Sequence, residues 1–204
     1  MTQTLQIHPQ NPQERLLRQA VEVLNRSGVI VYPTDSAYAL GCQIGDKDAA
    51  EEIRKIRHLD KNHNFTLVCR DLSEIATYAS VDNVTFRFLK AHTPGPYTFI
   101  LPATKDVPKR LQHPKRKTIG VRVPDNLIAQ MLLKELGAPL MSVTLILSDD
   151  GTPVTNLDEI QDRFKNQIDL ILDGGFCGVE PTTVIDFLSG APEVVRIGKG
   201  KILL

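Results

Sequence analysis

Short apolar runs alternate with helical segments through the first half of the chain, and strand-like runs dominate the second half. Residues 29–32 form a β-branched run that Pro33 stops, which is typical of a buried strand feeding a loop. Residues 46–59 follow as a predicted helix, with Ala49 and Ile53 on one face. This pattern predicts an α/β (α+β) domain with a large twisted mixed β-sheet flanked by helices, rather than a regular doubly wound fold.

Cap and turn residues set the boundaries of the other predicted elements. Asn11-Pro12-Gln13-Glu14 has the signature of a helix start with Asn11 as the cap, and we expect Gly28 to end that helix in a left-handed conformation. Further helices are predicted over 72–78, 84–91, 124–136 and 156–165. Further strands are predicted over 65–69, 97–101, 118–123, 140–147, 169–172, 183–187 and 194–197.

Length and composition are those of one domain that needs no covalent staple. A chain of 204 residues can bury roughly 70% of its unfolded surface. No repeat or linker divides it, so we predict one domain over 1–204 with its motif-bearing part at about 14–198. No apolar stretch approaches a membrane span and no secretory signal is evident, so we expect a cytoplasmic protein without a membrane partner. Three cysteines, Cys42, Cys69 and Cys177, are predicted to be reduced and mostly buried.

The formal net charge is zero, so any anion site must arise from local clustering. The loop Pro33-Thr34-Asp35-Ser36 offers two hydroxyls and a carboxylate directly after a rigid strand, where α/β proteins place ligands. The same side chains could instead cap a turn. Both interpretations remain open on this loop alone.

A basic cluster closes the predicted helix 46–59. Its cations complement the helix dipole, which explains one or two of them. Four cations packed together repel one another, and a polyphosphate ligand would relieve that repulsion. The members are Arg54, Lys55, Arg57 and His58.

A second basic run covers residues 105–117 and includes His113. It is either a solvated loop or a contact surface for nucleic-acid phosphates. Arg122 differs from these residues because it lies inside an apolar strand. A charge at such a position is costly unless it is paired, so we expect Arg122 to face a ligand or a carboxylate.

Several catalytic signatures do not occur in the sequence. The dinucleotide, P-loop, zinc-protease and nucleophile-elbow motifs are all missing, which argues against those four chemistries. What remains is a set of Thr, Ser, Lys and Arg residues suited to holding phosphates and a small polar substrate. Such a site can support transfer at phosphorus by positioning and charge neutralisation, with magnesium bridging the phosphates.

Residues 33–41, Pro-Thr-Asp-Ser-Ala-Tyr-Ala-Leu-Gly, resemble the Pro-Thr-Glu-Thr-x-Tyr-Gly-Leu-Gly opening of YrdC-type domains. The resemblance extends over about residues 14–198 and implies the YrdC-like fold with a concave basic cleft. Within that family, threonylcarbamoyl-AMP synthases convert ATP, bicarbonate and L-threonine into threonylcarbamoyl-adenylate and pyrophosphate. The adenylate then serves the threonylcarbamoyl modification of tRNA. The resemblance therefore implies ATP, bicarbonate and L-threonine, or a related small molecule, as substrates.

The resemblance also implies roles for individual residues. Lys55-Ile56-Arg57 resembles the family's Lys-x-Arg element, which makes Lys55 and Arg57 the implied catalytic residues. The implied ATP-binding residues are Lys55, Arg57, Asn64, Thr118, Thr144 and Arg196. The implied residues for an L-threonine-like substrate are Thr34, Arg122 and Thr182. No metal site on the protein is implied, and Mg²⁺ is expected only through the ATP phosphates.

Three features depart from the synthases. Residues 144–146, Thr-Leu-Ile, stand in place of Ser-x-Asn, so the hydroxyl is retained but Ile146 cannot hydrogen-bond as Asn does. Cys69 lies near a position where synthases often have His, and the segment 58–64 is longer. Together with His-Asn-Phe-Thr at 63–66, these features make the chain resemble most the YciO branch of the family.

The resemblance permits a second function without chemistry. YrdC-type domains are often described as binding double-stranded RNA, so the basic face could bind double-stranded RNA, tRNA or rRNA, including rRNA in the ribosome. That hypothesis predicts affinity that falls steeply with salt. It also predicts a stronger dependence on Lys115, Arg116 and Lys117 than on Lys55.

Overall fold

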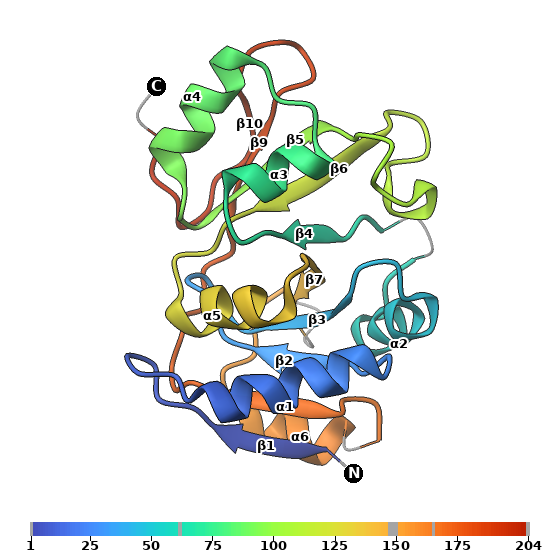
Figure 1. Cartoon of the computed structure of the whole chain (residues 1–204), viewed down its shortest axis with the longest axis vertical. Coiled ribbons are helices and arrows are strands. Elements are labelled where there is room, and N and C mark those ends of the chain that lie inside the picture. Colours follow the sequence, from blue (N-terminus) through green and yellow to red (C-terminus); the bar gives the residue numbers. More distant parts are fainter. Residues whose placement is uncertain (1, 61–62, 147–150, 165, 203–204) are drawn as a thin grey trace.

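The computed structural model describes residues 2–60, 63–146, 151–164 and 166–202. Within these residues the strands form one mixed sheet in the order β1-β8-β2-β3-β7-β4-β6-β5-β9-β10 (Figure 1). The strands are β1 (Gln3–Gln6), β2 (Ile30–Tyr32), β3 (Ala39–Gln43), β4 (Thr66–Val68), β5 (Tyr97–Pro102), β6 (Thr118–Arg122), β7 (Leu140–Thr144), β8 (Leu170–Asp173), β9 (Thr183–Asp186) and β10 (Glu193–Arg196). The helices are α1 (Glu14–Asn25), α2 (Lys47–Arg57), α3 (Leu72–Tyr78), α4 (Asn83–His92), α5 (Leu127–Leu136) and α6 (Leu157–Phe164), with a short 3-10 helix η1 (Lys109–Leu111). The predicted fold class is confirmed.

Pairing in the sheet mixes parallel and antiparallel neighbours. β7 is antiparallel to both β3 and β4, while β4 is parallel to β6. β5 is antiparallel to β6 and parallel to β9. The registers place Thr66 opposite both Ser142 and Gly120, and Gly120 opposite Ile100. These residues therefore form one row across the middle of the sheet.

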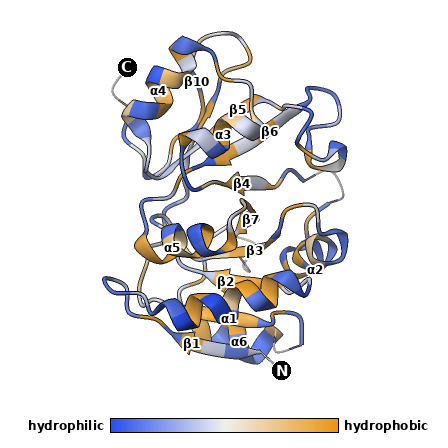
Figure 2. Cartoon of the chain, in the orientation of Figure 1, coloured by the Kyte–Doolittle hydropathy of each residue, from blue (hydrophilic) through white to orange (hydrophobic). Residues whose placement is uncertain are grey.

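Helices cover both faces of the sheet. α1 and α5 pack on one face, where Leu17 and Leu132 contribute to a buried cluster with Ile30. α2, α3, α4 and α6 contribute to the larger cluster on the other face. Apolar and hydrophilic residues alternate along α1 in Figure 2, as expected of a helix with one buried stripe. Ala39 and Val68 belong to the α1–α5 cluster and also line the cleft described below, so the cleft occupies the continuation of that face.

Most predicted elements are confirmed within a few residues, but β1 and β3 were not predicted. α5, predicted over 124–136, begins at Leu127 with Asn126 as its cap, and Gly137 ends it with φ of 70°. The predicted strand 140–147 ends at Thr144. Leu147 and Lys165, which fell within predicted elements, lie outside the described residues. No described helix has the length and apolarity needed to cross a bilayer.

The predicted start and end of α1 were wrong. The helix begins at Glu14, and its cap Gln13 makes no side-chain capping bond, so Asn11 is not the cap. Ser27, with φ of 63°, takes the left-handed conformation that Gly28 was expected to adopt. The Gly28 amide donates instead to the Val23 carbonyl at 3.0 Å. Glycine is needed there because a Cβ atom would lie 2.7 Å from the Val23 carbonyl oxygen.

Gly28→Ala is therefore expected to destabilise the fold by about 1–3 kcal/mol, because the new methyl group forces α1 away from the strand that follows. Urea denaturation measures this change. Gly190→Ala is the control. Its φ is positive, so this variant adds backbone strain, but the new Cβ would meet no atom within 4 Å. A Gly28→Ala loss below about 0.5 kcal/mol would contradict the close approach.

Candidate functional site

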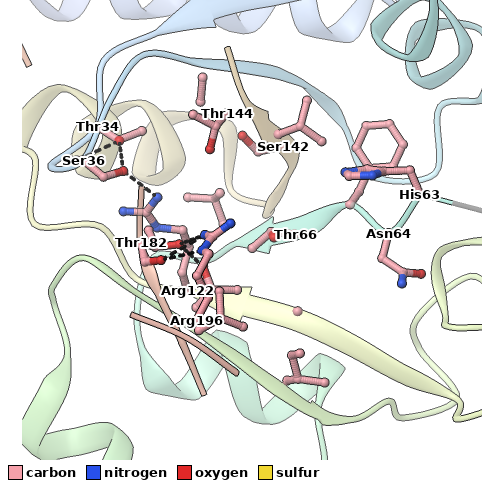
Figure 3. A pocket seen from close by; sticks show the side chains of 18 of the residues that line it. Thr34, Ser36, His63, Asn64, Thr66, Arg122, Ser142, Thr144, Thr182 and Arg196 are labelled. Atoms are coloured by element: carbon pink, nitrogen blue, oxygen red, sulfur yellow. Dashed lines mark hydrogen bonds between the residues drawn. The ribbon is translucent and has the colours of Figure 1, made fainter. Parts of the chain in front are cut away.

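A cleft of about 430 Å³ crosses the part of the sheet face that α1 and α5 leave uncovered. Its floor is built from small or short side chains on adjacent strands, including Thr66 on β4, Gly120 on β6 and Ser142 on β7. Residues with larger polar side chains lie around this floor. Figure 3 shows Thr34 and Ser36 at one end of the cleft and His63 and Asn64 at the other.

The first end is organised by the loop after β2. The Thr34 hydroxyl donates to the Ala37 carbonyl at 2.6 Å and accepts the backbone amides of Ser36 and Ala37 at 3.2 Å each. Both Thr34 and Ser36 are buried, and both line the cleft. The hydroxyls therefore cap a turn, as one of the two interpretations predicted, and they also form part of the cleft wall.

Arg122 reaches the same end from β6. Its guanidinium donates to the Ser36 hydroxyl at 3.3 Å and forms an ion pair with Asp35. The side chains of Arg122 and Asp35 are each only 8% exposed. The Asp35 carboxylate also accepts the Asp125 amide at 3.0 Å. The prediction that Arg122 faces a carboxylate is confirmed, and the pairing fixes the guanidinium in the wall of the cleft.

Thr182 and Arg196 complete the first end. The Thr182 hydroxyl lies 2.9 Å from the Thr98 hydroxyl on β5. Arg196, at the end of β10, donates to the Thr182 carbonyl at 2.9 Å and 3.2 Å. Burial lowers the pKa of Arg196, but a guanidinium in a protein stays protonated. The structure thus brings Thr34, Arg122, Thr182 and Arg196 together, as Figure 3 shows.

Arg57 lies at the second end, where α2 finishes. Its guanidinium donates to the Ile146 carbonyl. The Arg57 Nε atom is buried and has no hydrogen-bond partner among the described residues. His63 and Asn64 line the cleft beside it, and Thr144 lines it from β7. Arg57 is therefore held at one nitrogen, and none of the described residues that line the cleft offers it a carboxylate.

Lys55 is not brought to the cleft with Arg57. Its ammonium group pairs with Glu52 at 3.2 Å, and its side chain is 61% exposed. Arg54 pairs with Glu51 at 3.5 Å and lies over the Phe65 ring. The basic cluster at the end of α2 is thus divided. Arg54 and Lys55 pair with glutamates along the helix, whereas Arg57 lines the cleft.

The other wall of the second end comes from the basic run 105–117. His113 and Arg116 line the cleft, as does the buried Thr118 at the start of β6. Lys115 and Lys117 are exposed. Sequence reasoning named His113 only as part of this run and Arg116 only as a possible RNA contact, because nothing in a charge run distinguishes the side chains that line a cleft.

Four arginines and no aspartate or glutamate line the cleft within the described chain. The arginines are Arg57, Arg116, Arg122 and Arg196. Without carboxylates, this described part of the lining offers no strong ligand for a divalent cation. No group of three or more His, Cys, Asp or Glu among the described residues could hold a metal ion. The described donors of the cleft are suited to an anionic ligand.

Floor residues were also missed by the sequence interpretation. The Tyr32 hydroxyl donates to the Ser142 hydroxyl at 2.8 Å, and Ser142 donates to the Leu40 carbonyl at 2.9 Å. Burial raises the pKa of Tyr32 to about 12, so it remains a neutral donor. Ser142 is therefore fixed from two sides. The only available signal was the alternation of small polar residues along β7.

The cysteines contribute no reactive thiolate. Cys42 and Cys69 are buried and Cys177 is partly buried, and all three are free thiols. Burial raises the pKa of Cys42 to about 12 and that of Cys177 to about 11. At neutral pH these thiols are protonated, which excludes them as ready nucleophiles. The expectation of reduced, mostly buried thiols is confirmed.

His63 should make anion binding depend on pH. Burial, followed by the charge of Arg57, lowers its pKa below the ordinary value of 6.5. A bound polyphosphate would stabilise the imidazolium and raise that pKa, so the contribution of His63 to affinity should be greatest below the free pKa and disappear as pH rises through the bound pKa. Calorimetric ATP titrations between about pH 5 and pH 8 test this.

His63→Gln is the matched variant, because the titration of the ATP phosphates is the same for both proteins. We expect the affinity ratio of the original chain to the variant to be at least about threefold larger at the acid end. A ratio that is constant with pH would show that His63 does not sense the ligand charge.

These features define a class of protein: a mixed α/β domain whose open sheet face carries a concave cleft lined by arginines. A family model described as Telomere recombination (Sua5/YciO/YrdC) matches residues 22–198. The chain belongs to the Sua5/YciO/YrdC family, as its resemblance to YrdC-type domains predicted.

Relatives of this chain fall into two groups. It is 57% identical to the uncharacterized protein YciO of Escherichia coli K12 over 202 residues, covering 99% of this chain and 98% of that protein. It is 31% identical to threonylcarbamoyl-AMP synthase of Vibrio vulnificus over 161 residues, covering 78% and 86% of the two chains. The predicted likeness to the YciO branch is thus confirmed, alongside a more distant likeness to synthases.

Solved structures agree with the fold. The crystal structure of E. coli YciO superposes with a TM-score of 0.94 at 57% identity, covering 98% of each chain. P. abyssi Sua5, crystallised with L-threonine, superposes with a TM-score of 0.85 at 22% identity, covering 97% of this chain and 57% of that one. At that identity the second comparison supports the fold alone.

Proposed function

We propose that this chain binds ATP and a small amino acid in the arginine-lined cleft and forms threonylcarbamoyl-AMP or a related adenylate. The observation that carries the proposal is the division of the cleft into two polar ends joined by a floor of small side chains. The Vibrio vulnificus synthase at 31% identity supports the reaction class. The P. abyssi Sua5 complex, whose partner is L-threonine, supports an amino acid as co-substrate.

The end around Thr34, Arg122 and Thr182 suits the amino acid. Arg122 can pair with a carboxylate while Asp35 holds it in place, and the hydroxyls of Thr34 and Thr182 supply short-range polar contacts. The neutralisation of Arg122 by Asp35 limits how much charge this end can accept. A small zwitterion therefore fits better here than a polyanion.

The second end suits the triphosphate. Arg57, Thr118 and Thr144 present donors from three different elements, and no carboxylate lines the cleft to repel phosphate oxygens within the described residues. Arg196 lies nearer the amino-acid end, where it donates to Thr182. Lys55 pairs with Glu52 outside the cleft, so we assign the phosphate contact at the end of α2 to Arg57. Magnesium carried by the phosphates would neutralise part of their charge.

The reaction balances without a nucleophile from the protein. The amine of L-threonine and bicarbonate form a carbamate and water. A carbamate oxygen then bonds to the α-phosphorus of ATP while the bond from that phosphorus to the bridging oxygen breaks, releasing pyrophosphate. The chain contributes positioning and charge stabilisation through its arginines and hydroxyls, which are large terms in phosphoryl transfer.

The test supplies ATP, magnesium, bicarbonate and L-threonine and measures pyrophosphate release. The proposal expects release that requires both bicarbonate and an amino acid. Running the assay over a panel of amino acids identifies the preferred one. The panel is needed because Ile146 lines the cleft in place of the asparagine of the synthases, so threonine cannot be assumed to be the preferred amino acid. Release that is unaffected by omitting every amino acid would overturn the proposal.

Binding of double-stranded RNA is the contrasting outcome. Lys115 and Lys117 are exposed on the loop 105–117 and are available to phosphates of a large ligand. ATP affinity weaker than millimolar, together with salt-sensitive RNA affinity that depends on these lysines, would replace the enzymatic proposal with a binding role.

A further inference from the structure

His113 is locked in one orientation by its own loop. Its Nδ1 atom accepts the backbone amides of Lys115 at 3.3 Å and Arg116 at 3.1 Å. A nitrogen that accepts two amides carries no proton, so the neutral imidazole is protonated at Nε2. Because His113 lines the cleft, this ring can present an N–H donor to a ligand.

Arg116 lies beside His113 on the same bend. Its guanidinium pairs with Asp186 at 3.2 Å, and the side chains are 58% and 11% exposed. The Asp186 carboxylate also accepts the Leu188 amide at 2.8 Å. Arg116 is thus held by a carboxylate on β9 that is not among the residues lining the cleft, while Arg116 itself lines it.

The sheet register places this loop at the same end of the cleft as Arg57. β4 and β6 are parallel with Thr66 opposite Gly120, so the segments that lead into them enter at the same edge. Asn64 leads into β4, and the bend of His113 leads into β6. Figure 1 shows both strands starting on the same side of the sheet. Donors therefore converge there from two walls.

Opposite ends of the cleft are separated by most of a strand. Thr118 and Arg122 are the first and last residues of β6, so their Cα atoms lie about 13 Å apart at the usual rise of a strand. In an in-line displacement, the leaving group departs opposite the attacking atom. If the amino-acid carbamate attacks from the Thr34 end, the pyrophosphate must leave toward the second end.

We propose that His113 and Arg116 bind the leaving pyrophosphate, that is, the β- and γ-phosphates of the nucleotide, from the wall opposite Arg57. This inference rests on the proposed function. Donor side chains from both walls line this end, so they can surround two linked phosphate groups, which favours a diphosphate unit. The donor side chains are Arg57, Asn64, His113, Arg116, Thr118 and Thr144.

Calorimetric titration with inorganic pyrophosphate, ATP and AMP tests the assignment on the full chain. His113→Asn retains an acceptor for the two loop amides but removes the Nε2 donor. We expect it and Arg116→Ala to weaken pyrophosphate and ATP binding by about tenfold each. AMP binding should change less than about threefold, because AMP lacks the two outer phosphates.

Two control variants separate binding from loop structure. Lys115→Ala removes an exposed cation from the same loop and should change pyrophosphate affinity less than about twofold. Asp186→Asn releases Arg116 from its ion pair but keeps an acceptor for the Leu188 amide, so it should maintain or strengthen pyrophosphate binding. If Arg116 served only to pair with Asp186, Arg116→Ala and Asp186→Asn would weaken binding alike, and the proposal would be wrong.

The remaining outcomes are also decisive. Unchanged pyrophosphate affinity in His113→Asn and Arg116→Ala, with amino-acid-dependent release intact, would overturn this inference and leave the proposed function standing. If the two variants lose pyrophosphate affinity selectively but the original chain shows no amino-acid-dependent release, the diphosphate site is supported and the proposed reaction is overturned. An original chain that binds neither ATP nor pyrophosphate would overturn both.

Discussion

Asp35→Ala should destabilise the folded chain by about 3–5 kcal/mol, because it leaves the Arg122 guanidinium buried without a counter-charge. The side chains of both residues are only 8% exposed, so little water can reach the guanidinium to replace the lost carboxylate. The variant also removes the acceptor for the Asp125 amide. Urea denaturation followed by circular dichroism gives the change in the free energy of unfolding.

An exposed ion pair provides the comparison. Glu14→Ala breaks the pair of Glu14 with Arg18, whose side chains are 71% and 61% exposed, and should cost less than about 1 kcal/mol. Adding Arg122→Met to Asp35→Ala should recover part of the stability, because the unpaired charge is removed as well. An Asp35→Ala loss as small as that of Glu14→Ala would show that Arg122 does not depend on Asp35.

Arg57→Ala should weaken ATP binding by about 10–100-fold and slow pyrophosphate release accordingly. Arg57 alone contributes a cation to the cleft from α2, and its Nε atom is buried without a partner among the described residues. Arg57→Lys should recover only part of the affinity, because an ammonium cannot donate to two phosphate oxygens in the fork geometry of a guanidinium. Isothermal calorimetry and the pyrophosphate assay measure both effects.

Lys47→Ala is the matched control for Arg57→Ala. Lys47 is exposed at the first turn of the same helix, so this variant removes one positive charge without touching the cleft. ATP affinity should change less than about twofold. Equal losses in the two variants would indicate a general electrostatic effect of α2 rather than a contact made by Arg57.

The fold was predictable where periodicity and caps agreed. Asp46 caps α2 by accepting the amides of Asp48 and Ala49, and Gly137 ends α5, as expected from their residue types. β3 was missed because Ala39–Gln43 contains Gly and Ala, which have little strand preference, and it closely follows residues 33–36, which were interpreted as a loop. β1 was missed because Gln3–Gln6 is a mostly exposed edge strand without an apolar pattern.

The site was predictable in part. The loop after β2 and Arg122 could be recognised because a buried strand leads into polar residues and because a charge inside an apolar strand demands a partner. The sequence could not distinguish Lys55 from Arg57, since their separation depends on which cation pairs along the helix. The inward position of His113 depends on two amide contacts and on the register of β6 with β4, which only the folded chain reveals.

The position of β7 has a consequence for synthesis on the ribosome. β7 lies between β3 and β4 in the sheet, yet it follows β5 and β6 along the chain. Until it emerges, the nascent chain holds two sets of strands with unpaired edges, which other chains could join. Ser142 and Thr144 of the cleft arrive on the same strand. The event that joins the two halves of the sheet therefore also brings the floor of the cleft together. The cleft is complete only when Thr182 and Arg196, which lie later in the chain, have joined it.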